Sequence, residues 1–324
     1  MASPAKLQRR RTFRLRPRAP FHFDANLHKP SHFPSSDNAW QPGRFWITMR
    51  WRGRRLGLEM RNVGSQDAPE IRLTVFSASG LSEGYLRGLL PEIAWRFNLN
   101  QDISEFTEAY VDDEYLGPAI TRWRGMKPIA ANSLYETLMI YVVLQNAVIR
   151  RSIQMLEALF DHFGREVLFA GKALSTFWTP QEMALITEDA LRGLKVGYRA
   201  KTFLRITEPF AAGTVDERTL RTLPKDTIAQ AIDRLYGVGP ATLEYLLFED
   251  FYFLDALRVI PPWERKIMSR LLFQRRLVPE ERIRSFFRSR YPGFEKLAFH
   301  YLWEDLFWRR EHESIEWLER EIRR

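Results

Sequence analysis

Residues 235–247, with the sequence LYGVGPATLEYLL, constrain the fold more than any other part of the chain. Gly237, Val238 and Gly239 predict a tight turn, because glycine adopts positive φ and has no Cβ to block close approach. Pro240 suits the first position of a following helix, where its missing N–H costs little. The free backbone N–H groups at such a helix start can bind a phosphate. Taken alone, however, the motif favours an ordinary connection between two helices.

The chain before this motif divides into a strand-rich part and a helical part. RFWITMRW and LGLEMRNV, at residues 44–51 and 56–63, alternate apolar and polar residues, and EIRLTVFS at 70–77 predicts a third strand. Apolar residues then recur at helical spacing after Ser82. We therefore expect an α+β fold that begins with a small α/β lobe over residues 12–97, containing an antiparallel β-sheet with helices.

From residue 98 to residue 324 the patterns are those of helices throughout. Residues 133–164 open with a capping box, Ser133 to Glu136, and close at a glycine. This segment is long for one helix of a compact domain, so we expect two helices with a break at Gln145 and Asn146. The sequence predicts a mostly α-helical body after the lobe.

The charge of the chain indicates a polyanionic partner. There are 49 Lys and Arg against 40 Asp and Glu, a net charge of +9, and arginine suits phosphate because its planar guanidinium donates two parallel hydrogen bonds. Residues 1–18 contain no acid, and residues 1–11 predict a flexible basic tail. Two interpretations of that tail remain open, a solubilising segment and a clamp on a nucleic-acid backbone.

Several classes of site are excluded by composition. The chain has no cysteine, which excludes disulfides, thiolate zinc sites, a cysteine nucleophile and a cysteine-ligated iron–sulfur cluster. Its six histidines show no metal-ligand spacing, so we expect neither a metal nor a cofactor. No run of about 18 apolar residues predicts a membrane span, and the basic N-terminus lacks the apolar stretch of a secretion signal.

Three further motifs, together with the hairpin, resemble those of a known protein family. In DALRVIPPWERKIMSRLL, a proline pair precedes Trp263 and Glu264; SLYETLMIYVVLQN and LRGLKVGYRAKTFLRI lie upstream. In this order the motifs resemble the helix-hairpin-helix DNA glycosylase superfamily, whose members include 3-methyladenine DNA glycosylase II and 8-oxoguanine DNA glycosylase. The resemblance covers roughly residues 12–310 and implies a helical body of two subdomains with a cleft between them.

The resemblance implies a catalytic role for Glu264. It occupies the position of the family's aspartate, whose carboxylate assists base loss by opposing the positive charge of an oxocarbenium-like sugar or by orienting water. The alternative is a glutamate that caps the helix or pairs with charge near Arg265 in an inactive DNA-binding relative. Asp255 is a weaker second candidate. Ala241 stands where bifunctional members carry a lysine nucleophile, so no strand-cleaving lyase activity is expected.

The same resemblance implies the DNA contacts. Gly237, Val238, Gly239, Ala241 and Thr242 would bind the backbone, while Gln145 and Asn146 would probe the duplex, although such a pair can also be a plain helix cap. Trp263 and Trp303 are candidates for stacking on the flipped base; for Phe299 core packing is favoured, and Tyr198 and Lys201 are expected to be structural.

The expected function is that of a monofunctional glycosylase acting on a damaged base in double-stranded DNA, with an alkylated purine favoured. The alternative is a non-catalytic helix-hairpin-helix DNA-binding protein of the same fold. We further expect a monomer without membrane contact, in the cytoplasm of a prokaryote or the nucleus of a eukaryote.

Overall fold

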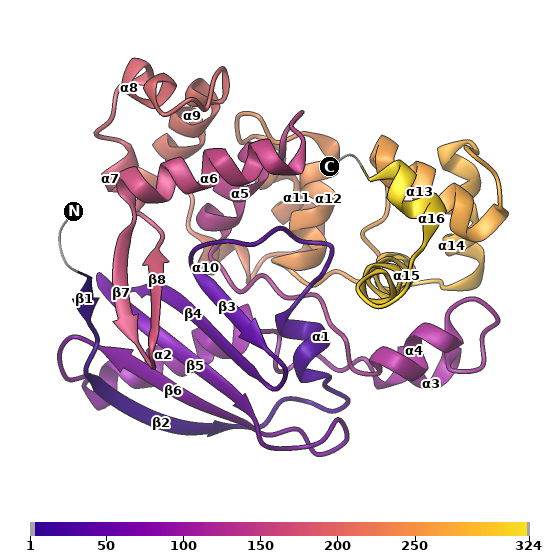
Figure 1. The fold of residues 1–324 in the computed structure, drawn as a ribbon, viewed down its shortest axis with the longest axis horizontal. Helices are drawn as coiled ribbons and strands as arrows, with labels where there is room; N and C mark the ends of the chain where they lie inside the picture. The colour runs from indigo at the N-terminus through magenta and orange to yellow at the C-terminus, as the bar shows by residue number, and fades with distance from the viewer. Residues whose placement is uncertain (1–3, 323–324) are drawn as a thin grey trace.

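The computed structural model describes residues 4–322, and Figure 1 shows a β-sheet lobe beneath a helical body. Within this range the larger sheet is antiparallel and five-stranded, in the order β2-β6-β5-β4-β3, with β2 (Arg9–Leu15), β3 (Asn38–Gln41), β4 (Arg44–Trp51), β5 (Arg54–Asn62) and β6 (Ile71–Ser77). A smaller sheet in the order β1-β7-β8 contains β1 (Ala5–Lys6), β7 (Arg165–Phe169) and β8 (Lys172–Thr176).

Both faces of the large sheet are covered. On one face, Ile47, Leu58 and Val75 pack in one core with residues of α2 (Glu83–Arg96). On the other face, Trp46 packs with residues of the β7–β8 hairpin. Gly57 is required on that second face, because a Cβ there would lie 2.4 Å from the ring of Phe169.

Two predictions of secondary structure were wrong. The expected flexible tail is not free from residue 5 onward: β1 pairs parallel with β7, and β2 pairs antiparallel with β6 from Arg9 to Leu15. The arginine run hides the strand pattern because β2 is an edge strand with its side chains mostly exposed.

The second error is the hairpin β7–β8, which lies inside the part that was predicted to be all helical. Its signal was the pair Ala170 and Gly171, both at positive φ, which is the requirement of a two-residue hairpin turn.

The helical body follows α1 (Phe23–Leu27) and the sheet lobe. Within the described range its helices are α3 (Ser104–Tyr110), α4 (Gly117–Trp123), α5 (Leu134–Leu144), α6 (Ile149–Phe163), α7 (Pro180–Met183), α8 (Glu188–Gly193), α9 (Arg199–Ala211), α10 (Glu217–Leu220), α11 (Lys225–Asp233), α12 (Pro240–Glu249), α13 (Pro262–Phe273), α14 (Glu280–Arg290), α15 (Glu295–Arg310) and α16 (Glu316–Glu321). The break between α5 and α6 falls at residues 145–148, and the capping box at Ser133 is formed. The expected α+β class, a sheet lobe followed by a helical body, is confirmed.

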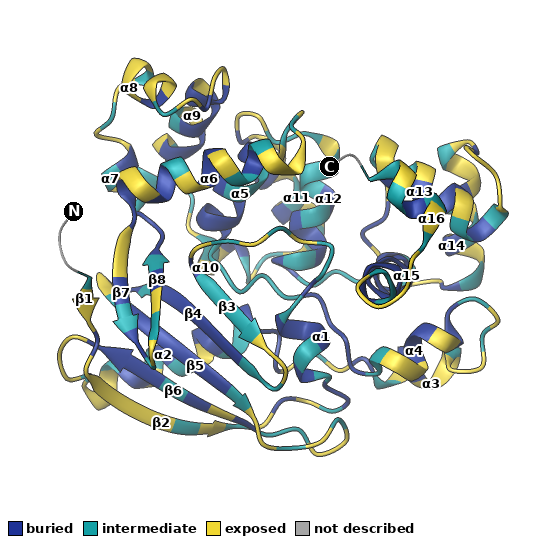
Figure 2. Cartoon of the chain, viewed as in Figure 1, coloured by how far each residue is buried: buried dark blue, intermediate teal, exposed yellow. Residues whose placement is uncertain are grey.

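Helix α15 is the central helix of the C-terminal part. Figure 2 shows it buried almost throughout, surrounded by α4, α13, α14 and α16. Its burial on all sides explains why its apolar residues occur on every side of the helix, whereas a surface helix would have them on one face only. Among residues 4–322, no helix combines the length and the apolar character needed to cross a membrane.

Candidate active site

The hairpin between α11 and α12 has the geometry that its glycines predict. Gly237 has a φ of +78°, and a Cβ there would lie 2.6 Å from the Cγ2 of Thr202. Gly239 is the N-cap of α12, and a Cβ there would meet no described atom within 4 Å. The start of α12 is therefore sterically open. Val238, Ala241 and Thr242 are half-buried around this turn.

The connection between α5 and α6 lies against this hairpin. Gln145 donates from Nε2 to the Gly237 carbonyl oxygen at 2.9 Å. Asn146 has a φ of +48°, and its Nδ2 lies 3.5 Å from the hydroxyl of Tyr198 at the start of α9. Tyr198, which we expected to be structural, is 54% exposed, whereas the Arg199 side chain beside it donates to the Gln145 carbonyl oxygen. The turn, the predicted probing residues and the start of α9 thus lie together.

Glu264 is buried in the first turn of α13, with 5% of its surface exposed. The Tyr245 hydroxyl, from α12, donates to its Oε1. Its Oε2 is shielded from solvent and has no hydrogen-bond partner among the described residues. Arg265 instead donates to the Val278 carbonyl oxygen, so it does not hold the carboxylate of its neighbour.

Burial raises the pKa of Glu264 to about 7, with the positive charge of Lys296 opposing the rise and the negative charge of Glu304 adding to it. A carboxyl group with this pKa changes charge near neutral pH, as catalytic carboxyl groups do. Asp255 is in a different environment: its side chain is 47% exposed and forms an ion pair with Lys225 at 2.6 Å.

Aromatic rings and a lysine surround Tyr245. The Tyr141 ring, on α5, stacks on that of Tyr245 at 5.9 Å between centroids, and its hydroxyl donates to Glu249 at 2.6 Å. The ammonium of Lys296, on α15, lies 4.7 Å from the Tyr245 ring centroid and 4.8 Å from that of Phe299. A lysine enclosed by rings next to a buried carboxylate forms a preorganised electrostatic environment.

The sequence argument missed Tyr245 and Lys296, and it missed two further polar residues on α15, His300 and Glu304. A signal was present: Lys296, His300 and Glu304 occur every four residues in a segment rich in apolar side chains, which places them along one side of the helix. All three are buried.

The two tryptophans predicted for base stacking touch one another but differ in exposure. Trp263 is 41% exposed, and its ring meets that of Trp303 edge-on at 4.8 Å between centroids. Trp303 is buried and stacks on Phe299 at 6.1 Å. Trp263 therefore remains partly accessible to solvent, whereas Trp303 and Phe299 pack within the body.

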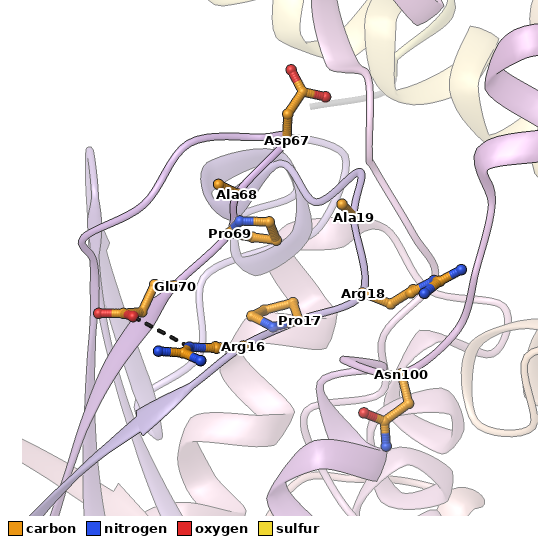
Figure 3. Close-up of a pocket in the computed structure, with 9 residues that line it drawn as sticks. All are labelled: Arg16, Pro17, Arg18, Ala19, Asp67, Ala68, Pro69, Glu70 and Asn100. Carbon is orange, nitrogen blue, oxygen red and sulfur yellow. Dashed lines mark ion pairs between the residues drawn. The ribbon is translucent and has the colours of Figure 1, made fainter.

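A separate hollow of about 590 Å³ lies on the sheet lobe, where Arg16, Arg18, Asp67, Glu70 and Asn100 contribute to its wall (Figure 3). Its cations are already paired, Arg16 with Glu70 at 3.6 Å and Arg18 with Asp102 at 2.8 Å. None of the residues predicted for catalysis or DNA contact lines it. We assign it no role in the chemistry.

Comparison with known proteins finds distant relatives and solved structures of the same fold. No family model matches the chain. A probable N-glycosylase/DNA lyase of Methanothermobacter thermautotrophicus is 24% identical over 202 residues, 56% of this chain and 64% of that protein. A DNA-3-methyladenine glycosylase of Bacillus subtilis is 21% identical over 164 residues, 50% of this chain and 54% of that protein. The chain thus spans less than two thirds of the length of these curated relatives.

Solved structures match over nearly the whole chain. The 3-methyladenine DNA-glycosylase of Archaeoglobus fulgidus superimposes with a TM-score of 0.72 at 16% identity, covering 94% of this chain and 99% of that one. The 8-oxoguanine glycosylase/lyase of Clostridium acetobutylicum gives a TM-score of 0.67 at 17% identity, covering 90% and 95%. The chain has the fold of the DNA glycosylases. Its resemblance to their helix-hairpin-helix superfamily, inferred from the motifs, is confirmed.

Proposed function

We propose that the protein is a monofunctional DNA glycosylase, which flips a damaged base out of duplex DNA and hydrolyses its N-glycosidic bond to leave an abasic site. The observation that carries the proposal is the position of Glu264. One oxygen of this buried carboxylate is held by Tyr245, on the helix that begins at the hairpin predicted to bind DNA, and the other faces no described hydrogen-bond donor.

The carboxylate of Glu264 would act on the sugar as the base leaves. An ionised carboxylate at this point opposes the positive charge of an oxocarbenium-like transition state or orients the attacking water. Tyr245 fixes Oε1, so Oε2 is the oxygen available for that task.

Binding of DNA is supported by three features. The net charge of +9 favours a polyanion, the open N-terminus of α12 offers backbone N–H groups to a phosphate, and Asn146 lies exposed beside it. The Clostridium acetobutylicum protein has also been solved with double-stranded DNA, at a TM-score of 0.66. Gln145 and Asn146 would occupy the space that the flipped nucleotide leaves.

The preference for an alkylated purine is supported by the names of the relatives. Two of the relatives above are named 3-methyladenine glycosylases.

The test is release of free base from duplexes that each carry one defined lesion, with the strands analysed before and after alkali. We expect an alkylated purine to be released and the strand to break only after alkali. Borohydride should trap no covalent adduct, because Ala241 offers no amine where bifunctional members use one. A trapped adduct that Lys296→Met abolishes would overturn the monofunctional assignment, and release of no base from any duplex would favour the non-catalytic DNA-binding protein.

A further inference from the structure

Four arginines lie side by side on the outer face of the large sheet, the face on which Trp46 packs with the β7–β8 hairpin. Residues directly opposite one another on paired strands project from the same face of a sheet. The pairing registers align one arginine from each of four neighbouring strands: Arg14 on β2, Arg72 on β6, Arg61 on β5 and Arg44 on β4. Arg44 and Trp46 are two residues apart on β4, so this line, the arginine row, lies on the outer face.

The arginine row is open to solvent. The β7–β8 hairpin covers the neighbouring part of the outer face, where its Phe169 ring meets that of Phe76, and Figure 1 shows the hairpin across one end of the strands. In the row itself, the side chains of Arg14 and Arg61 are 76% and 42% exposed, and Arg72 is exposed as well. A large partner can therefore reach the row.

Two carboxylates contact the row, and each is shared or lies at its end. Glu59 accepts from Arg44 Nε at 2.7 Å and from Arg61 Nη2 at 3.0 Å, so one negative charge serves two guanidinium groups. At the edge of the sheet, Glu70 accepts from Arg14 Nη1 at 2.8 Å. Like charges directly opposite one another destabilise a sheet, and these two acids do not remove that repulsion along the whole row.

Other cations on this face have no acid at all. Arg72, in the middle of the row, forms no hydrogen bond or ion pair within residues 4–322, and the same is true of Arg10, which lies opposite Phe76 on this face. Lys172, on the hairpin, adds an ammonium 4.8 Å from the ring centroid of Trp46. The outer face thus carries uncompensated positive charge, and an anion bound across the row would reduce the repulsion.

The length of the row fits the backbone of a DNA duplex. Neighbouring strands lie about 4.8 Å apart, so four strands set the arginines along about 14 Å. One strand of B-DNA carries a phosphate every ~3.4 Å of helix axis, so about four phosphates lie within that length. An extended acidic peptide places side chains on one side only about every 6.6 Å, which matches the row less well. Arginine also donates two parallel hydrogen bonds to a phosphate.

The face favours a duplex over a single strand. Proteins that hold single strands stack the unpaired bases on exposed aromatic rings. The rings of Trp46, Phe76 and Phe169 on this face are all buried, and the guanidinium of Arg44 lies 4.5 Å from the ring centroid of Trp46. Cations without an accessible ring suit a backbone whose bases are already paired.

We propose that the arginine row is a second DNA-backbone site, which binds a duplex segment other than the one at the hairpin of α11 and α12. The sheet lies far from that hairpin in Figure 1, so one molecule would hold two segments at once. The basic N-terminal segment then acts on a nucleic-acid backbone as part of a strand and not as a free tail. This inference goes beyond the proposed function, because the row needs neither a lesion nor Glu264.

The experiment asks whether one molecule binds two duplexes. The full chain is first saturated with a short abasic-site duplex of about one and a half helical turns, ~15 base pairs, too short for two molecules to share easily. A labelled undamaged duplex of the same length is then titrated in at low salt, and the mass of the complex is followed by sedimentation. We expect a complex with two duplexes that loses the second one as salt is added.

The decisive variant combines Arg14→Gln with Arg72→Gln, which removes two charges of the row and keeps the side-chain length. The second duplex should bind roughly tenfold more weakly, and the salt slope of its binding should fall by about 2. Affinity for the first duplex should be unchanged. The matched control is Arg9→Gln: Arg9 is exposed on the same strand, but it lies opposite Ser77 and therefore on the other face. The melting temperature at low salt should not fall in the double variant, because the change removes repulsion.

Failure of the wild type to bind a second duplex at low salt would overturn the proposal, and so would equal weakening by Arg9→Gln and the double variant. Poly-glutamate is the competitor: if it binds the row more tightly than a duplex of equal charge, an acidic protein segment is the occupant and the DNA assignment is wrong. The outcome is separate from the proposed function. Base release without a second bound duplex leaves the function standing alone, whereas a second bound duplex without base release leaves only the arginine row.

Discussion

Replacing Glu264 with glutamine tests the catalytic assignment directly. Glu264→Gln keeps the side-chain length and can still accept from Tyr245, but it removes the negative charge that would oppose the sugar cation. We expect single-turnover excision to fall by roughly two to four orders of magnitude. Affinity for abasic-site DNA should be unchanged, because the hairpin and its surroundings are intact.

The raised pKa of Glu264 sets the size of the expected change in excision rate with pH. With the pKa of Glu264 raised to about 7, only about a tenth of the molecules carry the carboxylate at pH 6, and most carry it at pH 8. In the proposed mechanism the ionised form of Glu264 is the active one, so the excision rate should rise roughly tenfold from pH 6 to pH 8 and then level off. Tyr245→Phe removes a donor that favours the ionised form, so it should move the midpoint upward.

The assay is release of base from a single-lesion duplex with enzyme in excess, so that product release does not limit the rate. Asp255→Asn is the matched control, since Asp255 is exposed and paired with Lys225. If Glu264→Gln excises as fast as the wild type while Asp255→Asn does not, the assignment is wrong and Asp255 becomes the candidate. A flat profile between pH 6 and pH 8 would contradict the role of the ionised carboxylate.

Other predictions concern stability and DNA contact. Burial raises the pKa of Asp250 well above its ordinary value. As the pH rises, Asp250 therefore ionises in the unfolded chain before it does so in the folded protein, and the folded protein loses stability. Asp250→Asn should raise the melting temperature at pH 8, and should raise it less at pH 5. Gly237→Ala should destabilise the protein by about 1 kcal/mol or more in denaturant titrations and weaken duplex binding, because the site has positive φ and no room for a Cβ. Lys201→Ala, beside the exposed Tyr236 next to the hairpin, should lower duplex affinity and reduce the salt slope by about 1 in filter binding. Arg9 lies on β2, at the edge of the sheet far from α11 and α12 in Figure 1, so Arg9→Ala should change neither the duplex affinity nor the salt slope.

The sequence was sufficient where structure is local. Strand β4 spans the predicted residues 44–51, because alternation and a following turn specify it without reference to the rest of the chain. The break after Leu144 follows from the length of the segment, and the turn before Pro240 follows from its glycines. Residues 5–15 could not be predicted as strands, since their pairing partners lie some 60 to 160 residues away and their own composition suggests a solvated segment.

The site was predictable only in part for the same reason. Glu264 could be located because it follows a short motif. Tyr245 could not be identified as its partner, because nothing in the local pattern shows that α12 brings this hydroxyl to the start of α13. Lys29 Nζ lies 3.0 Å from His300 Nε2 although the two residues are 271 positions apart along the chain, and only the packing of the α1 loop against α15 unites them.

The two glutamates are coupled, and the coupling has a measurable sign. The negative charge of Glu304 disfavours ionisation of Glu264 and so contributes to its raised pKa. Glu304→Gln removes that charge and should therefore shift the midpoint of the excision profile to lower pH, opposite in direction to Tyr245→Phe. A cationic alkylated base bound beside Glu264 would act in the same direction as Glu304→Gln, because its charge favours the carboxylate form of Glu264. The midpoint measured on a 7-methylguanine duplex should accordingly lie below that measured on a hypoxanthine duplex, which carries no such charge. Identical midpoints on the two duplexes, together with no shift in Glu304→Gln, would mean that the two carboxyl groups do not interact during catalysis.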